Sequence, residues 1–465
     1  MLFNSFVFLC AFLPITYVVF WSLRGARPRY VWLALTGYVF YGYWDPRFTL
    51  LMAFSTIVSY LAGLGFLRWR DPRHRRLCLV VPITVDLLLL GFFKYANFFL
   101  DSVRHVAAAA GVEMAVPVLN VVLPVGISFY TFHTISYIVD SYRGTIKPTR
   151  NFFEFAAYVS LFSQLVAGPI VRFRQIEADL EAIGQTDRRR WLSLGISFFI
   201  IGLAEKVIVA DTLAGFVDPA LEHYQQLGSS AIWLVFIAYS FQLYFDFCGY
   251  SDMAVGLGYM FGLRIPQNFN SPYKALDPSD FWRRWHISLS TCLRDYIYIP
   301  LGGNRGGEAK TYRNLMLTML IGGLWHGANW TFVIWGGYHG LLLAAYRRFA
   351  AAWDVLPAVI RQALMFVLVL IGWVFFRCPD LSMALLMLQR MFLFTPGASL
   401  AGQASLGLCL VLSAWLAMVA PNAFDIHRGE WRLSTTQRYA LAAAFGACLA
   451  LMAGTGSSPF LYFQF

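Results

Sequence analysis

One histidine, His326, lies in a part of the chain that otherwise has the composition of a lipid-embedded segment. The run from Leu315 to Tyr346 contains no Asp, Glu, Lys or Arg, and an ionisable group at such a depth is costly and usually marks function. Imidazole titrates close to neutral pH, which makes it the usual general base. The alternative is a core histidine satisfied by a neighbouring carbonyl or hydroxyl group. We predict that His326 is catalytic and takes a proton from an alcohol.

The residues around His326 have the properties of a dry, aromatic pocket. Gly323 and Gly327 leave room for a backbone or a ligand to approach closely. The other neighbours combine hydrogen-bonding groups with large aromatic walls, an environment that suits proton abstraction. The predicted substrate-binding residues here are Trp325, Asn329 and Trp330.

A second histidine, His286, is the other catalytic candidate. It follows Phe281-Trp282-Arg283-Arg284-Trp285, and its alternative interpretation is a histidine at the level of the lipid headgroups. A third, His339, lies thirteen positions beyond His326. On a continuous helix it would point roughly 220° away, so we expect His339 to serve in packing.

The segment 263–313 must position His286. It is polar, basic and rich in aromatic residues, and it separates two apolar blocks. Its prolines prevent one long helix, but Asp277-Pro278-Ser279-Asp280 is a plausible helix start, with proline in the first turn and carboxylates at the positive end of the dipole. Apolar positions then recur at helical spacing up to Tyr298. We predict interfacial helices on the cytoplasmic side, including an amphipathic helix over 281–298.

Several acidic groups lie within apolar segments and need partners. The sequence pairs Glu205 with Lys206 and Asp211, and Asp246 with Asp252. Such groups form helix–helix pairs or line hydrophilic paths, and we predict that Asp246 lines the route to the pocket. The seven cysteines are scattered without a CxxC pair, so no metal site and no disulfide framework is predicted.

The composition indicates a polytopic membrane protein that is entirely α-helical. Of 465 residues, 58% are hydrophobic and 13% are charged, about half the charged share of a soluble domain. With about 20 apolar residues per span, roughly ten to twelve candidates appear. They lie near residues 3–23, 30–44, 48–67, 77–100, 116–139, 152–171, 191–217, 230–262, 315–346, 358–376, 400–420 and 437–453.

The formal charge of +11 does not indicate a nucleic-acid partner. The arginines are spread over short loops between apolar segments, as expected for a protein of the cytoplasmic membrane that follows the positive-inside rule. The chain contains no GxSxG, phosphate-binding loop or HExxH motif, so a serine hydrolase, an ATP-driven pump and a zinc protease lack support.

One apolar stretch is interrupted around Leu161–Arg174, where Gln164, Gly168 and Pro169 break the helical pattern. Irregular backbone at membrane depth is tolerated only where protein or water surrounds it. We therefore predict re-entrant helices within a single transmembrane domain over residues 1–465, with the active-site helix region at 315–346.

Several longer stretches resemble the membrane-bound O-acyltransferase family, in its bacterial branch that O-acetylates exopolysaccharides such as alginate or cellulose. Together these stretches cover nearly the whole chain in the expected order. They are Gln164–Ile170, Tyr244–Asp252, Pro266–Tyr273, Phe281–Ser290, Leu324–Trp330 and Pro459–Phe465.

The resemblance implies a helical core of about 11 transmembrane helices around a central tunnel, in the bacterial inner membrane. His326 matches the essential histidine of the family and His286 its second important histidine. The implied enzyme is an O-acetyltransferase that moves acetyl groups from a cytoplasmic donor, acetyl-CoA, and binds no permanent cofactor. The implied partners are a periplasmic SGNH-hydrolase-like acetyltransferase and the proteins of polysaccharide synthesis and export.

Joining the resemblance to the residues gives a mechanism in which His326 deprotonates an acceptor hydroxyl that attacks the thioester. Asn329 or backbone N–H groups near the glycines hold the oxyanion. Three cations of segment 263–313 are candidates for binding the phosphates of coenzyme A: Lys274, Arg283 and Arg284. The alternative is that they are ordinary residues of the positive-inside rule. Two alternatives remain, a D-alanyl transferase for teichoic acid that uses a carrier protein, and a non-enzymatic transporter.

Overall fold

The computed structural model of the chain describes residues 1–114, 119, 121–400, 402–427, 433–456 and 458–461. The described residues form helices and loops and no β-strand, which confirms the all-α prediction. The chain divides into two compact units, Met1–Gly195 with Leu257–Pro266 and Ile196–Gly256 with Gln267–Phe465. We describe each unit by itself, and the single domain over residues 1–465 stays a prediction.

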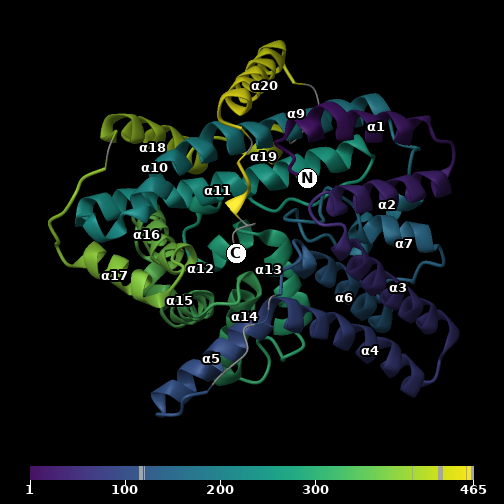
Figure 1. Cartoon of the computed structure of the whole chain (residues 1–465), viewed down its shortest axis with the longest axis horizontal. Helices are drawn as coiled ribbons and strands as arrows, with labels where there is room; N and C mark the ends of the chain where they lie inside the picture. Colours follow the sequence, from purple (N-terminus) through teal and green to yellow (C-terminus); the bar gives the residue numbers. More distant parts are fainter. Residues whose placement is uncertain (115–118, 120, 401, 428–432, 457, 462–465) are drawn as a thin grey trace. The chain divides into compact units, whose positions relative to one another are not determined.

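The first unit is built mainly from the N-terminal helices, coloured purple to blue in Figure 1. Its helices are η1 (Phe8–Phe12), α1 (Leu13–Ser22), α2 (Ala26–Gly42), α3 (Arg47–Arg68), α4 (Pro72–Leu90), η2 (Gly91–Tyr95), α5 (Ala96–Ala109), α6 (Ile127–Arg143), α7 (Phe152–Val159) and α8 (Phe173–Glu181). Asp86 on α4 accepts hydrogen bonds of 2.6 Å from Ser55 on α3 and from Thr134 on α6. One buried carboxylate therefore ties three helices together.

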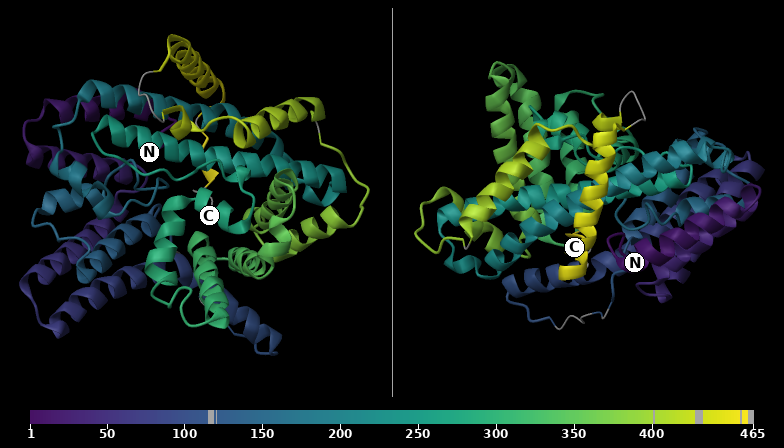
Figure 2. Two further views of the ribbon diagram at one scale, coloured as in Figure 1. Left: turned by 180° about the vertical axis from the view of Figure 1, so that it is seen from behind. Right: turned by 90° about the horizontal axis from the view of Figure 1, so that it is seen from above.

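The second unit contains the remaining helices; α9 (Arg188–Ala204) and α11 (Ser229–Met260) begin in one unit and end in the other. Its other helices are η3 (Glu205–Ala210), α10 (Asp211–Glu222), η4 (Tyr224–Gln226), η5 (Pro272–Lys274), α12 (Pro278–Arg284), α13 (Ile287–Leu293), η6 (Arg294–Tyr298), α14 (Glu308–His326), α15 (Trp330–Asp354), α16 (Ala358–Arg377), α17 (Leu381–Phe392), α18 (Gln403–Met418), α19 (Ala423–His427) and α20 (Thr435–Thr455). Helix α15 packs against both α14 and α16, as the two views of Figure 2 allow the reader to follow.

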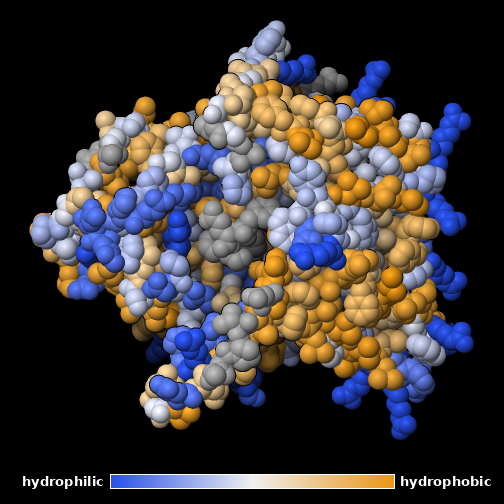
Figure 3. Space-filling view, in the orientation of Figure 1, coloured by the Kyte–Doolittle hydropathy of each residue, from blue (hydrophilic) through white to orange (hydrophobic). Residues whose placement is uncertain are grey.

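The surface of the protein is suited to lipid. Five helices or helix runs among the described residues are long and apolar enough to cross a membrane: Arg47–Arg68, Pro72–Ala109, Arg188–Glu222, Ser229–Met260 and Ala358–Arg377. Large hydrophobic side chains such as Leu50, Val18 and Leu61 lie exposed, and Figure 3 shows broad apolar areas with hydrophilic side chains projecting at their edge. A multi-pass membrane protein is confirmed, whereas the count of about 11 spans stays a prediction.

The predicted interruption at Leu161–Arg174 is present in the first unit. Helix α7 ends at Val159 and α8 begins at Phe173, and the connection between them is irregular and buried. Polar side chains satisfy part of its backbone: Gln164 donates to the carbonyl of Tyr158 (2.8 Å), and the Tyr158 hydroxyl donates to the carbonyl of Val171 (3.0 Å). Protein therefore surrounds this irregular backbone, as its depth requires.

Candidate active site

His326 is the last residue of α14, and a short connection, Gly327–Asn329, leads into α15. The segment 315–346 is therefore two helices rather than one continuous helix. Asn329 caps α15: its Oδ1 accepts from the backbone N–H of Thr331 (3.0 Å), and its Nδ2 donates to the carbonyl of Pro379 (2.6 Å). Capping of this kind satisfies backbone groups at a helix start, and it places His326 at a break in the backbone.

Glycines let α14 and α15 pack with their backbones in contact. A Cβ atom on Gly323 would lie 2.3 Å from the carbonyl oxygen of Phe332, and one on Gly336 would lie 2.3 Å from that of Met319. Both distances are far too short for any side chain, so the hairpin requires glycine at each position. The close backbone approach predicted at Gly323 is thus confirmed, and its effect is to hold His326 against α15.

His286 lies in a second break, between α12 and α13. The sequence predicted one amphipathic helix over 281–298, and this is wrong: α12 ends at Arg284, and His286 has φ 44° and ψ 54°. The predicted start is confirmed, because Asp277 caps α12 by accepting from the N–H of Asp280 (2.7 Å). A left-handed conformation at a residue other than glycine is uncommon and costs roughly 1–3 kcal/mol. Tertiary contacts must offset that cost.

Asn268 supplies those contacts and fixes the orientation of the imidazole. Its Oδ1 accepts from the backbone N–H of Ser288 (3.2 Å) and from the Ser288 hydroxyl (2.8 Å), and its Nδ2 donates to Ser251 (3.1 Å). Because Oδ1 is an acceptor, the Nδ1 atom of His286, 3.1 Å away, must carry the hydrogen. The Nε2 atom is then the acceptor, and it has no hydrogen-bond partner among the described residues.

The two imidazoles lie close together within a wall of aromatic rings. Their ring centroids are 6.3 Å apart, and Trp325 contacts both rings, at 5.0 Å from His326 and 6.1 Å from His286. His326 is 3% exposed and His286 is fully buried. Burial lowers the pKa of His286 to about 3, because desolvation disfavours the imidazolium. The His286 imidazole is therefore neutral at physiological pH, and its Nε2 can accept a hydrogen bond.

Sequence reasoning did not identify several residues of this wall. Phe247 lies 4.7 Å from His286 by ring centroids, and Trp335 and Phe376 lie 5.0 and 5.3 Å from His326. Trp335 and Phe376 come from α15 and α16, and nothing in their local sequence distinguishes them from other core aromatic residues. Phe247 and Asn268 lie in the motif stretches Tyr244–Asp252 and Pro266–Tyr273, but the sequence assigned neither residue a role.

His339 packs in the same aromatic cluster, as predicted, although the geometric reason for the prediction does not hold. The angular argument assumed one helix through His326, whereas the chain is broken at Gly327–Asn329. Trp335 contacts both histidines, at 4.8 Å from His339 and 5.0 Å from His326. His339 also lies 5.2 Å from Trp282. A tryptophan ring therefore separates His339 from the pair formed by His286 and His326.

The polar motif Asp246–Asp252 directs consecutive residues of α11 to different neighbours. Residues four apart share a helix face, and Phe247 and Ser251 accordingly face His286 and Asn268. Asp246, one position earlier, faces Lys206, with 2.5 Å between its Oδ1 and the ammonium. The predicted partners are therefore rearranged: Lys206 pairs with Asp211 (2.8 Å) and Asp246, whereas Glu205 lies beside Asp252.

The terminal motif contacts the same buried ion pair. The Lys206 ammonium donates to the Ser458 hydroxyl (3.1 Å) and the Pro459 carbonyl (3.3 Å), and Asp246 accepts from the N–H of Leu461 (2.9 Å). The rest of the motif, residues 462–465, lies outside the described residues. Asp246 thus fastens the chain end, and its prediction as a substrate-binding residue stays a prediction.

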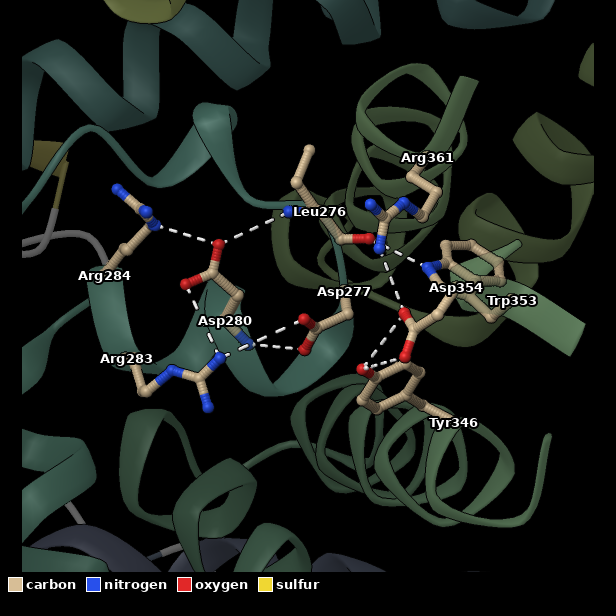
Figure 4. A network of polar contacts seen from close by, with 9 residues as sticks. All are labelled: Leu276, Asp277, Asp280, Arg283, Arg284, Tyr346, Trp353, Asp354 and Arg361. Atoms are coloured by element: carbon tan, nitrogen blue, oxygen red, sulfur yellow. Dashed lines mark hydrogen bonds and ion pairs between the residues drawn. The ribbon is translucent and has the colours of Figure 1, made fainter. Parts of the chain in front are cut away.

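The remaining predicted binding residues are exposed or contact other groups. Trp330 is 54% exposed at the start of α15, and Lys274 donates to the carbonyls of Val419 (3.3 Å) and Ala420 (2.7 Å). Figure 4 shows Arg283 and Arg284 in a network around Asp280, at 3.6 and 3.0 Å. Their guanidinium groups bind the carboxylates that begin α12, and Arg283 keeps two thirds of its side chain exposed.

Comparisons with known proteins fit this geometry. The model of the membrane-bound O-acyltransferase family matches residues 144–385, which include both histidines. A protein of Azotobacter vinelandii named "Probable alginate O-acetylase AlgI" is 42% identical over the full length of both chains. A peptidoglycan O-acetyltransferase of Helicobacter pylori is 38% identical over 84% of this chain and 80% of its own. A teichoic acid D-alanyltransferase of Bacillus subtilis is 31% identical over 66% and 77%.

Proposed function

Because the chain belongs to the membrane-bound O-acyltransferase family, we propose that it moves acetyl groups from cytoplasmic acetyl-CoA across the inner membrane to O-acetylate an exopolysaccharide. That the chain is an O-acetyltransferase follows from the family and from its acetylating relatives, and this decides for an enzyme over a transporter. Alginate is the polymer named for the relatives that match the whole chain. Cellulose stays an alternative polymer.

The observation that carries the proposal is the placement of His326 beside a neutral imidazole in an aromatic, nearly dry wall. In the proposed reaction His326 takes the proton of an acceptor hydroxyl as the oxygen attacks the thioester carbonyl. A tetrahedral oxyanion forms, the carbon–sulfur bond breaks, and the imidazolium returns the proton to the departing thiolate. His286 orients the acceptor molecule by accepting a hydrogen bond from a donor group other than the reacting hydroxyl, because Asn268 leaves its Nε2 as a hydrogen-bond acceptor.

Backbone N–H groups at the break after His326 are the donors that we expect to stabilise the oxyanion by hydrogen bonds. Within the described part of the chain, Gly327 and Ala328 donate no backbone hydrogen bond, and they lie in the turn that carries His326. Asn329 was the other predicted donor, but its amide already donates to Pro379. We therefore favour the two backbone groups, since donors preorganised at a helix break need little reorganisation.

For the donor, we propose that the basic segment 263–313 faces the cytoplasm and binds the phosphates of coenzyme A. Arg283 is the strongest candidate, because two thirds of its side chain is exposed and its nearest carboxylates lie 3.6 and 4.0 Å away. Lys274 and Arg284 are more deeply engaged with carbonyls and with Asp280. On the far side, a periplasmic SGNH-hydrolase-like acetyltransferase completes transfer to the polymer, together with the proteins of synthesis and export.

The test is the acetyl content of the polymer made by cells that carry His326→Ala at matched membrane abundance. Proton transfer by a positioned base contributes roughly 10²–10⁴-fold, so acetylation falls at least about a hundredfold. His339→Gln is the matched control, because His339 packs in the same cluster behind Trp335, and it keeps acetylation within a few fold. Wild-type acetylation by His326→Ala protein would end the proposal.

A D-alanyl transferase is the second candidate, because teichoic acid D-alanyltransferases also match the chain, at 31% identity over 66% of it. Radiolabelled donors separate the two functions. Purified protein that takes label from acetyl-CoA supports acetylation, whereas label taken only from a D-alanyl carrier protein supports the alternative.

A further inference from the structure

A second cluster of chemically capable side chains lies on a different face of α11 from the one that borders His286 and Asn268. It forms where α9 and η3 cross α11. A Cβ atom on Gly202 would lie 2.3 Å from the carbonyl of Gly249, and one on Gly249 would lie 2.5 Å from that of Gly202. The two backbones therefore touch. Directly after this contact, the helix changes to π-type over Glu205–Ala210, a local widening that often accompanies functional sites.

The crossing brings three potential metal ligands together. One donor atom from each of Glu205, Cys248 and Asp252 lies within 4.8 Å of the other two. Cys248 and Asp252 are four residues apart and share one face of α11, with exposures of 2% and 5%. Glu205 reaches them from the first position of η3. Glu205 is far from the other two residues in sequence, so the set of three gave no metal-binding motif.

The charges at this crossing do not balance. The region holds four carboxylates, those of Glu205, Asp211, Asp246 and Asp252, and one ammonium, that of Lys206. The salt bridges of Lys206 go to Asp211 and Asp246, at 2.8 and 2.5 Å. Among the described residues, no cation pairs with Glu205 or Asp252.

The Asp252 side chain itself points to a missing ligand. It is 95% buried, and no hydrogen bond or salt bridge joins it to another side chain in the described ranges. The Oε2 atom of Glu205 is likewise buried without a hydrogen-bond partner there. An unpaired carboxylate costs several kcal/mol in such surroundings, and two adjacent ones cannot both stay ionised without a counter-charge.

We propose that Glu205, Cys248 and Asp252 bind a divalent transition-metal cation of the zinc type. One thiolate and two carboxylates form a mixed sulfur and oxygen set that suits such a cation better than Mg²⁺ or Ca²⁺, which take oxygen alone. Ligands of tetrahedral zinc lie roughly 3.5 Å apart, so small side-chain rotations close the site. The fourth position is left to water or to the hydroxyl of Tyr244, which contacts Cys248 from one turn earlier.

The bound cation would fasten η3 to α11 and thereby fix the neighbouring Lys206. Since Lys206 and Asp246 hold residues 458–461, the site would also stabilise the attachment of that segment to α11. This inference does not depend on the acyl donor or on the polymer.

The first experiment titrates the purified, metal-stripped full-length chain with Co²⁺ as a spectroscopic probe for Zn²⁺. We expect one equivalent to produce thiolate-to-cobalt charge-transfer absorption, which Zn²⁺ then displaces. Cys248→Ser removes the absorption, whereas Cys378→Ser, which changes another buried thiol, retains it. Absence of absorption in the wild-type chain, or its survival in Cys248→Ser, overturns the proposal.

The second experiment does not depend on the folding of the cysteine variant. Zn²⁺ affinity, measured by competition with a chromophoric chelator, falls about tenfold or more in Asp252→Asn and in Glu205→Gln. Metal also raises the unfolding temperature of the wild-type chain by mass action, and it leaves that of Asp252→Asn unchanged. If the wild-type chain shows neither saturable binding nor stabilisation, the two carboxylates share a proton and the proposal is wrong.

Discussion

Buried polar groups are neutral beside one face of α11 and ion-paired on another. On one face, Phe247 borders the His286 imidazole, which burial keeps neutral, and Ser251 accepts from Asn268, which orients that ring. On the other face, Asp246 and Lys206 keep their charges by pairing at 2.5 Å. The Nε2 atom of a neutral His286 stays available to accept a hydrogen bond, whereas a buried charge that loses its partner is strongly destabilised. The first arrangement suits chemistry and the second suits fixation.

The two faces also differ in what they contact. The aromatic face meets His286 and Asn268, which belong to the proposed site. The charged face meets η3 and the chain end, where the Lys206 ammonium also lies 4.9 Å from the ring centroid of Phe460. Substitutions on the charged face should therefore lower the stability of the folded chain, and those on the aromatic face should lower the rate of acetyl transfer.

The largest effect on folding is expected for Lys206→Met. It leaves the buried Asp246 and the partly exposed Asp211 without their ammonium, and removal of one partner of a buried pair costs roughly 3–5 kcal/mol. The measurement is the unfolding transition of the full chain in lipid nanodiscs. Lys206→Met with Asp246→Asn recovers part of the loss, since one unpaired charge is gone. His286→Phe keeps a ring in the aromatic wall, so it lowers the free energy of unfolding by less than half as much. Equal losses of stability in Lys206→Met and His286→Phe would show that the two faces do not differ.

Part of this arrangement could be predicted from the sequence, because local signals determine it. The carboxylate and proline at Asp277-Pro278 mark the start of α12, and the polar residues of Leu161–Arg174 mark the irregular connection. His326 was identifiable from its depth in an uncharged run. In each case the physical cause lies within a few residues of the feature.

The rest depends on contacts that are remote in sequence. No local signal indicates that His286 takes a left-handed conformation, because the cost is offset by Asn268, eighteen residues earlier. Neighbouring residues Glu205 and Lys206 were assigned a common set of partners, but the π-helix directs them to different ones. Local sequence suggested pairing between neighbours on one helix. The close contact at Gly202 and Gly249 instead brings partners from α11 to both residues.

An intermediate effect is expected for Asn268→Asp, which tests whether the aromatic face works because His286 is neutral. A carboxylate at Asn268 Oδ1, 3.1 Å from Nδ1, favours the imidazolium. The pKa of His286 therefore rises from about 3. In the pH profile of acetyl transfer, activity below the new pKa is lost and returns as pH increases, so the acidic limb moves to higher pH. Asn268→Leu removes the orienting acceptor without adding charge, and it lowers kcat without moving that limb. An unshifted profile in Asn268→Asp would show that the charge state of His286 does not matter.

The smallest effect is expected for Arg283→Gln. This variant tests whether an exposed charge outside both faces of α11 contributes to binding of acetyl-CoA. The guanidinium is two-thirds exposed and lies 3.6 and 4.0 Å from Asp280 and Asp277 (Figure 4). Exposed pairs contribute about 0–1 kcal/mol, so unfolding barely changes. If Arg283 binds a phosphate of the donor, KM for acetyl-CoA rises several fold at unchanged kcat, and more steeply at low salt because screening is weaker. Arg361→Gln is the control, since Arg361 pairs with Asp354 at 3.0 Å in the same network and should leave KM unchanged. Equal KM values in both variants would assign Arg283 to membrane topology alone, and the donor phosphates would then need a cation closer to the histidines.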